Sequence, residues 1–188
     1  MTINDGDVVR DVLAGDRNAF VHLVEAYQRR LFGLVLMIVR EPDVAEEVTQ
    51  DTFVRAFMYL RKYDASRAFY PWLATIAVRL AQNWMRQRGR TVRRQGVSPE
   101  DVEEPAAAAS ALSTLITDER SRRIWQAVAS LPSGERTPAL LYYRDSLPVR
   151  DIAIALGVSP GTIKTLFFRA RRHLRERVGT DSISDEER

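Results

Sequence analysis

The chain has 188 residues, of which 45% are hydrophobic and 28% charged, a balance that excludes a disordered or fibrous protein and suits one ordinary domain or two small ones. It has no cysteine, which excludes a disulfide framework, and no apolar run approaches the roughly 18–20 residues that span a bilayer. Since the opening MTINDGDVV lacks the basic and apolar parts of a secretory leader, we expect a cytoplasmic protein without direct membrane insertion.

The net charge of +3 is distributed unevenly along the chain. Residues 1–95 carry +4 and residues 120–178 carry +8, whereas residues 96–119 carry −6 and residues 179–188 carry −3. Within the first basic block, residues 65–99 hold seven arginines and no acid. This asymmetry indicates a polyanionic partner such as nucleic acid. Arginines that merely keep helix faces in contact with water are the alternative explanation.

Apolar residues recur at helical spacing almost throughout the chain and strand signals are weak everywhere, so an all-α fold is predicted. Residues 5–14 are expected to form the first helix, and Asn18 to cap the second. Pro42 suits the first turn of a third helix. Pro71 suits the first turn of a fourth helix, which is expected over residues 68–88.

Residues 89–117 lose the helical pattern and contain an acidic cluster, which is typical of a flexible linker. Thr117 is then expected to cap a new helix, and residues 133–178 to hold three more. The acidic, serine-rich end is expected to be disordered. The predicted organisation is two small helical domains over 1–95 and 118–178, a flexible acidic linker over 96–117 and a tail over 179–188.

The sharpest local pattern is that of a helix-turn-helix over residues 149–164 (VRDIAIALGVSPGTIK). The small Ala153 lets a second helix cross the first closely, and Gly157 supplies the left-handed conformation of the turn. Val158 is expected to fill the corner, and Ser159 to cap the second helix ahead of a proline at its first position.

The second helix of this pattern is expected to turn Ile163 and Phe167 toward the core and to leave a basic outer face. Such a face fits the major groove of duplex DNA, where Lys and Arg reach guanine edges or phosphates. An ordinary helical hairpin with an arginine-rich surface is the alternative. The predicted DNA-binding residues are Lys164, Thr165, Phe168, Arg169, Arg171 and Arg172.

The predicted fourth helix mixes aromatic, arginine and amide side chains over residues 68–86. Aromatic rings beside cations can stack unpaired bases and follow the backbone of a single strand. Trp72 shares a helical stripe with apolar residues and is expected to pack in the core. The residues expected nearer the surface are Phe69, Tyr70, Arg79 and Asn83.

Three segments together resemble the bacterial sigma factors of the extracytoplasmic-function (ECF) group, namely residues 43–57 (DVAEEVTQDTFVRAF), 68–83 and 146–172. The resemblance extends over residues 19–178. It implies a first domain, sigma region 2, that binds the clamp helices of core RNA polymerase and captures the melted −10 promoter element. It implies a second domain, sigma region 4, whose helix-turn-helix binds the −35 element and touches the polymerase flap. An anti-sigma factor is the implied regulator.

The resemblance also implies roles for particular residues. Glu47, Gln50 and Asp51 are placed on the face that meets core polymerase, and Phe69, Tyr70, Arg79, Asn83 and Arg86 on the −10 site. Lys164, Thr165, Phe168 and Arg169 match the positions that read the −35 element. The chain departs from the family in having Arg79 where asparagine is frequent and Leu166 where a basic residue is frequent. Pro138 is expected to move a helix start to a cap at Thr137.

Other classes of protein account for fewer of these features. A duplex-only helix-turn-helix regulator with a helical sensor domain leaves the basic-aromatic helix and the acidic face of residues 43–51 without a role. An enzyme is not expected, because His22 and His173 lack carboxylate or thiol neighbours at ligand spacing and no phosphate-binding GxxxxGK is present. We therefore predict no catalytic residue, metal, cofactor or small-molecule substrate. A helical scaffold predicts no affinity for DNA.

Overall fold

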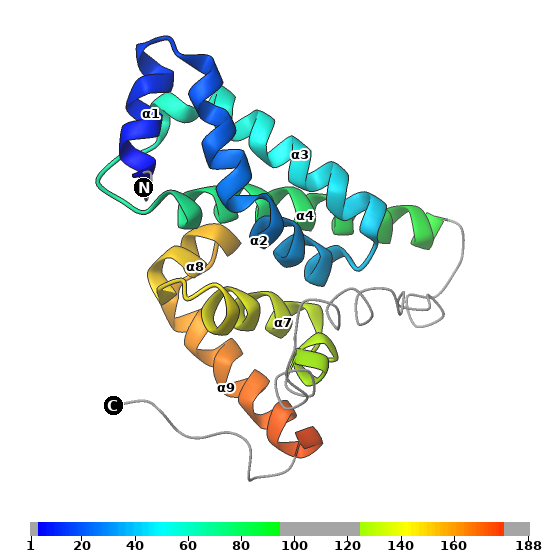
Figure 1. The fold of residues 1–188 in the computed structure, drawn as a ribbon. Helices are drawn as coiled ribbons and strands as arrows, with labels where there is room; N and C mark the ends of the chain where they lie inside the picture. Colours follow the sequence, from blue (N-terminus) through cyan, green and yellow to red (C-terminus); the bar gives the residue numbers. More distant parts are fainter. Residues whose placement is uncertain (1–3, 95–124, 179–188) are drawn as a thin grey trace. The chain divides into compact units, whose positions relative to one another are not determined.

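The computed structural model describes residues 4–94 and 125–178 (Figure 1). Within these two ranges the regular structure is helical and no strand is present, which confirms the all-α fold class. The chain divides into two compact units, which contain the first and the second of these ranges. The predictions of a linker over 96–117, a Thr117 cap and a tail over 179–188 lie outside the described residues.

The first unit is built from long helices joined by short connections. Its elements are α1 (Asp5–Ala14), η1 (Arg17–Ala19), α2 (Phe20–Val39), α3 (Pro42–Met58), η2 (Leu60–Lys62) and α4 (Phe69–Arg94). As predicted, Gly15 ends α1 with a φ of 120°, and Pro42 opens α3. The prediction of an Asn18 cap is wrong. The Asp16 carboxylate accepts the N–H of Asn18 at 3.1 Å, so the acid two residues earlier closes the turn and α2 begins later, at Phe20.

The core of the first unit forms around α2, which contacts α1, α3 and α4 (Figure 1). Every residue from Leu31 to Val39 is buried except the half-buried Phe32, as is typical of a helix that is apolar on all sides. The neighbouring helices approach closely because they bring small residues to the contact, namely Ala45, Ala56, Ala74, Ala77 and Ala81, all with 0% exposure.

The second unit packs α7 and α8 against the long helix α9. Residues 125–129 are helical, and α7 (Ser133–Ala139), the π-helix η3 (Leu140–Arg144), α8 (Val149–Leu156) and α9 (Pro160–Val178) follow. The buried stripe of α9 consists of Ile163, Phe167, Ala170 and Leu174, as predicted. None of the described helices is alone long and apolar enough to cross a membrane; α8 and α9 reach that length and composition only as a pair bent by 100°.

The prediction of a helix start at Thr137 is wrong. Ser133 already opens α7, so Pro138 lies inside this helix and the Thr137 hydroxyl donates to the carbonyl oxygen of Ser133 at 3.3 Å. Pro138 has no N–H to continue the hydrogen-bond pattern of the α-helix. Two residues later the helix changes to the wider π-helix η3. The N–H of Asp145 there reaches back five residues, to the carbonyl oxygen of Leu140 at 3.2 Å.

The fold also gives His173 a partner that the sequence did not reveal. Its Nδ1 lies 2.7 Å from Oε2 of Glu135, a residue 38 positions earlier that is only 8% exposed. The prediction that no carboxylate neighbours His173 is therefore wrong in three dimensions. No group of three or more His, Cys, Asp or Glu in the described part of the chain could hold a metal ion. The pair acts as a structural contact between α7 and α9.

Candidate nucleic-acid interface

The helix-turn-helix forms as predicted. The helices α8 and α9 meet at 100°, within the range of about 90–120° typical of this motif. Gly157 adopts a φ of 68° in the turn. The N–H of Thr162 donates to Oγ of Ser159 at 3.1 Å, which satisfies an end group of α9. Val158, which was expected to fill the corner, is 38% exposed, so that prediction is wrong; Ile152 and Ile163, on the two helices of the motif, are buried.

We expect Gly157→Ala to destabilise the second unit by about 1–2 kcal/mol, because a left-handed residue with a Cβ meets its own carbonyl group. A Cβ at Gly157 would meet nothing else within 4 Å, so the cost is purely conformational. Urea unfolding measures it. The control is Gly134→Ala, in α7, where a Cβ also has open space and where alanine is expected to be neutral or stabilising. Equal effects of the two substitutions would contradict the conformational explanation.

The outer face of α9 carries all the predicted −35 residues in accessible positions. Lys164, Thr165, Phe168, Arg169 and Arg172 are exposed and Arg171 is half-buried. Phe168 is 62% exposed, so its ring is available to a partner. Leu166 is half-buried beside this face. The geometry agrees with a recognition helix, and the role of each residue stays a prediction.

A second basic surface runs along α4. Four exposed residues, Arg79, Asn83, Arg86 and Arg90, recur at intervals of four, three and four and therefore lie on one face of the helix. Nη2 of Arg86 donates to Oδ1 of Asn83. Traced back toward the start of α4, the same register passes through Thr75, Trp72 and Ala68. We call this row of seven residues the α4 strip.

Phe69 and Tyr70 are not on this surface, so their predicted exposure is wrong. Phe69 is 0% exposed and Tyr70 4% exposed. The ring centroid of Tyr27 lies 5.8 Å from that of Phe69 and 5.6 Å from that of Tyr70. The guanidinium carbon of Arg30 lies 3.7 Å from the centroid of the Tyr70 ring. Tyr27 and Arg30 belong to α2 and lie about 40 residues earlier in the sequence. The apolar periodicity within α4 therefore gives no sign that they cover its first turn.

Like Trp84 in the same helix, Trp72 keeps part of its surface exposed, although it was expected in the core. It is half-buried, and its ring is supported by Tyr63 at 5.3 Å and by Phe69 at 5.5 Å between centroids. The sequence could have indicated the position of Trp72. Counting back seven residues, or two helical turns, from Arg79 reaches Trp72, which therefore lies on the same helix face as Arg79, Asn83 and Arg86.

The exposed segment Asp64–Ala68 leads into the α4 strip and is held by its own hydrogen bonds. The carboxylate of Asp64 accepts the N–H of Ser66 at 3.0 Å and its hydroxyl at 2.7 Å. The bonds from the Ser66 hydroxyl and N–H lower the pKa of Asp64. The Tyr63 hydroxyl donates to the carbonyl oxygen of Arg67, and burial raises the pKa of Tyr63. The segment is therefore an ordered turn. It joins Tyr63 to Phe69, whose rings pack with those of Tyr27 and Tyr70 in a cluster of protein side chains that we call the aromatic base of the α4 strip.

The predicted polymerase-binding residues form an exposed row on α3. Glu47, Gln50 and Asp51 all face outward, with Nε2 of Gln50 donating to Oε1 of Glu46 at 3.3 Å. The row continues in two apolar residues that the sequence reading missed, Val54 at 58% exposure and Met58 at 69%. The i, i+3, i+4 spacing of helix neighbours could have found them. The row is acidic at one end and apolar at the other.

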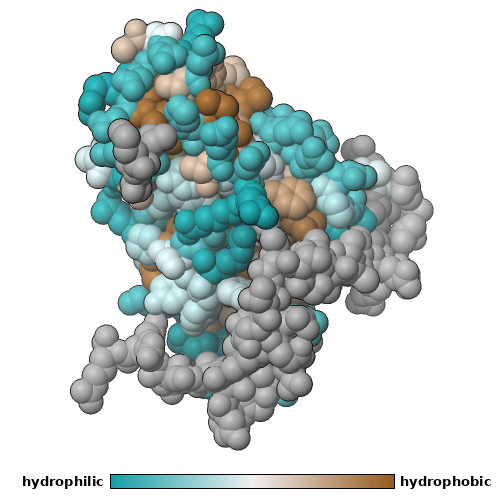
Figure 2. All heavy atoms as spheres, viewed as in Figure 1, coloured by the Kyte–Doolittle hydropathy of each residue, from teal (hydrophilic) through white to brown (hydrophobic). Residues whose placement is uncertain are grey.

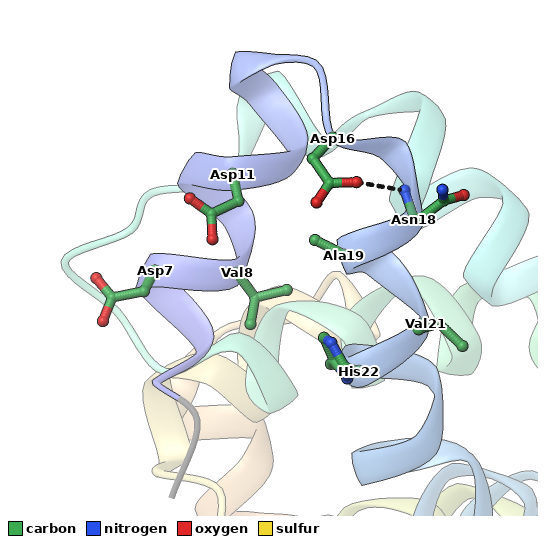
Figure 3. Close-up of a pocket in the computed structure, with 8 residues that line it drawn as sticks. All are labelled: Asp7, Val8, Asp11, Asp16, Asn18, Ala19, Val21 and His22. Carbon is green, nitrogen blue, oxygen red and sulfur yellow. Dashed lines mark hydrogen bonds between the residues drawn. The ribbon is translucent and has the colours of Figure 1, made fainter. Parts of the chain in front are cut away.

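A cavity of about 440 Å³ lies between α1 and the start of α2, away from the predicted site residues (Figure 3). It is lined by Asp7, Val8, Asp11, Asp16, Asn18, Ala19, Val21 and His22. His22 is exposed, with Nδ1 3.8 Å from Oε2 of Glu25. Figure 2 shows apolar surface among polar residues over α1 and α2, where Leu13 and Val21 are 45% and 49% exposed.

Comparison with known proteins assigns both units. The family model for sigma-70 region 2 matches residues 23–91, and that for sigma-70, region 4 matches residues 121–174. The RNA polymerase sigma-H factor of Pseudomonas aeruginosa is 32% identical over 173 residues, 89% of this chain and 90% of that protein. The ECF RNA polymerase sigma-E factor of Escherichia coli K12 is 30% identical over 94% of this chain and 95% of its own length. The chain belongs to the ECF sigma factors.

Solved structures agree on the fold of this ECF sigma factor. CnrH, solved in complex with the cytosolic domain of CnrY, matches with a TM-score of 0.66 and 22% identity over 96% of this chain and 100% of its own. The sigma factor RpoE of Bartonella quintana, solved with the anti-sigma factor NepR, matches with a TM-score of 0.65 and 23% identity over 86% and 98%. As a sigma factor the protein directs transcription by RNA polymerase, which confirms the predicted function over the duplex-only regulator.

Proposed function

We propose that this ECF sigma factor directs core RNA polymerase to one class of promoters by binding two DNA elements in different physical states. The −35 element is bound as duplex by α9, and the −10 element as an unpaired strand by α4. The observation that carries this proposal is that each unit presents its own basic helix face. One is the outer face of α9, the second helix of the helix-turn-helix, and the other is the face of α4 that includes Trp72, whose ring packs on Tyr63. The protein works in the cytoplasm and catalyses no reaction itself.

At the −35 element, Lys164 and Arg169 would bind guanine edges or phosphates, and Phe168 would lie against a thymine methyl group. Thr165, Arg171 and Arg172 would contribute to the same contact from the remaining outer positions of α9. A good bidentate contact between a side chain and a base discriminates by about 1–3 kcal/mol. The basic face of α9 therefore has the chemistry for both affinity and sequence preference.

At the −10 element, Arg79, Asn83 and Arg86 would follow the unpaired strand along the α4 strip, and Trp72 would stack a base. Opening the duplex costs roughly 1.4 kcal/mol per base-pair step. Stacking a base on an aromatic side chain returns about 1–3 kcal/mol. Capture of the separated strand can therefore drive melting without hydrolysis of ATP. Phe69 and Tyr70 act from beneath this surface as its support.

Core polymerase would meet the exposed row of α3. The polar residues Glu47, Gln50 and Asp51 suit basic groups on the clamp helices, and Val54 and Met58 suit an apolar contact beside them. The second unit would also touch the polymerase flap. If region 2 occupies residues 1–95 and region 4 occupies 118–178, polymerase fixes the distance between two weak DNA sites and turns the second contact into an intramolecular one.

An anti-sigma factor is the regulator that we propose. The solved relative RpoE is in complex with the anti-sigma factor NepR, and CnrH with the cytosolic domain of CnrY. A protein of this kind would hold the chain inactive by covering the α3 row and the polymerase-binding part of the second unit. The exposed Val54 and Met58 give such a partner an apolar surface to bury.

The test is transcription by the reconstituted holoenzyme. Core polymerase with the purified chain is used to select promoters from randomised DNA, and run-off transcripts from a selected promoter are then measured. We expect transcripts only when the chain is present and only when both promoter elements are intact. Failure of the chain to associate with core polymerase in every condition, together with tight binding to duplex DNA alone, would instead support the duplex-only regulator.

A further inference from the structure

One carboxylate of α1 reaches the aromatic base of the α4 strip. Oδ2 of Asp5 accepts the hydroxyl hydrogen of Tyr27 at 2.5 Å, across 22 positions of the sequence. Burial, followed by this hydrogen bond to Asp5, raises the pKa of Tyr27, so the hydroxyl keeps its proton and stays a donor. The Asp5 charge is also felt by Tyr63, whose pKa it raises after burial. Asp5 is therefore bonded to Tyr27, and its charge also acts on Tyr63.

These two tyrosines support the surface on which the proposed strand capture depends. Tyr27 packs on Phe69 and Tyr70, the first two residues of α4. Tyr63 packs on Phe69 at 5.3 Å, with the rings at 80°, and on Trp72. Trp72 is thus connected to Asp5 through one hydrogen bond and a continuous set of ring contacts.

The backbone of α1 also lies beside the exposed turn that precedes the α4 strip. A Cβ built on Gly6 would lie 4.0 Å from the carbonyl oxygen of Ala65. The helix α1 contacts η2, the element directly before this turn (Figure 1). The Tyr63 hydroxyl donates to the carbonyl oxygen of Arg67, so the turn is bonded to one of the packed tyrosines and lies beside α1.

We propose that Asp5 is a positioning residue for capture of the unpaired −10 strand. Through Tyr27 it fixes the aromatic base beneath Trp72, and with the start of α1 it seats the segment Asp64–Ala68 at the head of the α4 strip. This inference rests on the proposed function, because it assumes that the strip binds a single strand. Asp5 itself does not touch the DNA.

The experiment compares holoenzymes that carry Asp5→Ala, Tyr27→Phe or both. The DNA is a fork built from the selected promoter, with the −10 non-template strand either unpaired or fully paired. We expect each single variant to lose about fivefold to tenfold in affinity for the unpaired fork, the equivalent of one hydrogen bond. The double variant is expected to lose no more than either single one, because both changes remove the same bond. Affinities for core polymerase and for duplex −35 DNA are expected to be unchanged.

The matched control is Asp7→Ala, which removes a carboxylate of the same helix that pairs with exposed Arg10 at 2.9 Å and not with Tyr27. Asp5→Asn, which keeps an acceptor oxygen, is expected to restore part of the lost affinity. Variants that bind the unpaired fork as the wild type does would overturn the inference. So would a loss of core polymerase affinity in parallel, because Asp5 would then serve only the fold. If the wild-type holoenzyme shows no preference for the unpaired fork, the proposed function itself fails.

Discussion

Replacing Lys164 and Arg169 together by alanine is expected to reduce transcription from −35-dependent promoters by roughly 100-fold or more. Each contact to a base or phosphate is worth about 1–3 kcal/mol, and 1.4 kcal/mol corresponds to a factor of ten. Both side chains are exposed on α9 and neither belongs to its buried stripe, so the fold is expected to be unaffected. Run-off transcription measures the loss, and the salt dependence of DNA binding measures the number of phosphate contacts removed.

The control for this double variant is Arg10→Ala with Arg17→Ala, which removes the same charge from exposed positions of the first unit. It is expected to leave −35 recognition intact, because the effect depends on the position of the charges and not on the net charge. Polymerase binding in a pull-down is expected to persist in both double variants. Loss of polymerase by the Lys164 and Arg169 variant would show that this face of α9 meets the enzyme instead of the DNA.

Phe69→Ala is expected to destabilise the first unit by about 3–5 kcal/mol, the usual cost of truncating a buried phenylalanine. Its ring is 0% exposed and contacts Tyr27, Tyr63 and Trp72, so the substitution leaves a cavity where three other rings meet. Chemical unfolding followed by circular dichroism measures the change. Since small domains have only about 5–15 kcal/mol of stability, promoter melting is expected to fall with the folded fraction.

The matched control is Phe168→Ala, which removes the same side chain from a position that is 62% exposed. Its effect on stability is expected to stay within about 0.5 kcal/mol. A Phe69→Ala variant with unchanged unfolding and a selective loss of −10 binding would contradict the structure and restore a direct contact between this ring and the DNA.

The features that the sequence predicted well are those set by near neighbours in the chain. Gly157 and Ser159 specify the turn and the cap of the helix-turn-helix within three residues, and the structure has both. The stripe of Ile163 and Phe167 follows from helical periodicity alone. Such features depend on local backbone geometry, for which the identity of one residue and its spacing to the next are sufficient.

The predictions that failed depend on residues far away in the sequence. The burial of Phe69 and Tyr70 is produced by Tyr27 and Arg30, and the partner of His173 lies in another helix. Periodicity shows which face of a helix is apolar, but it does not show which neighbour covers the first turn. The exposed row of α3 and the position of Trp72 are intermediate cases. Both follow from the three- and four-residue spacing of one helix face, so the sequence alone could have predicted them.

The contact between His173 and Glu135 bears on the proposed binding of the −35 element by α9. A helix can bring the same side chains to a groove at different angles of rotation about its own axis, and neighbouring residues differ by about 100°. His173 fastens one end of α9 to α7, while the capped start of the helix carries Lys164 and Thr165. If α9 binds the −35 element as we propose, this contact would help the buried stripe to set the angle at which these side chains meet the base pairs, and substitutions at Glu135 are expected to alter base preference without removing any side chain from the basic face.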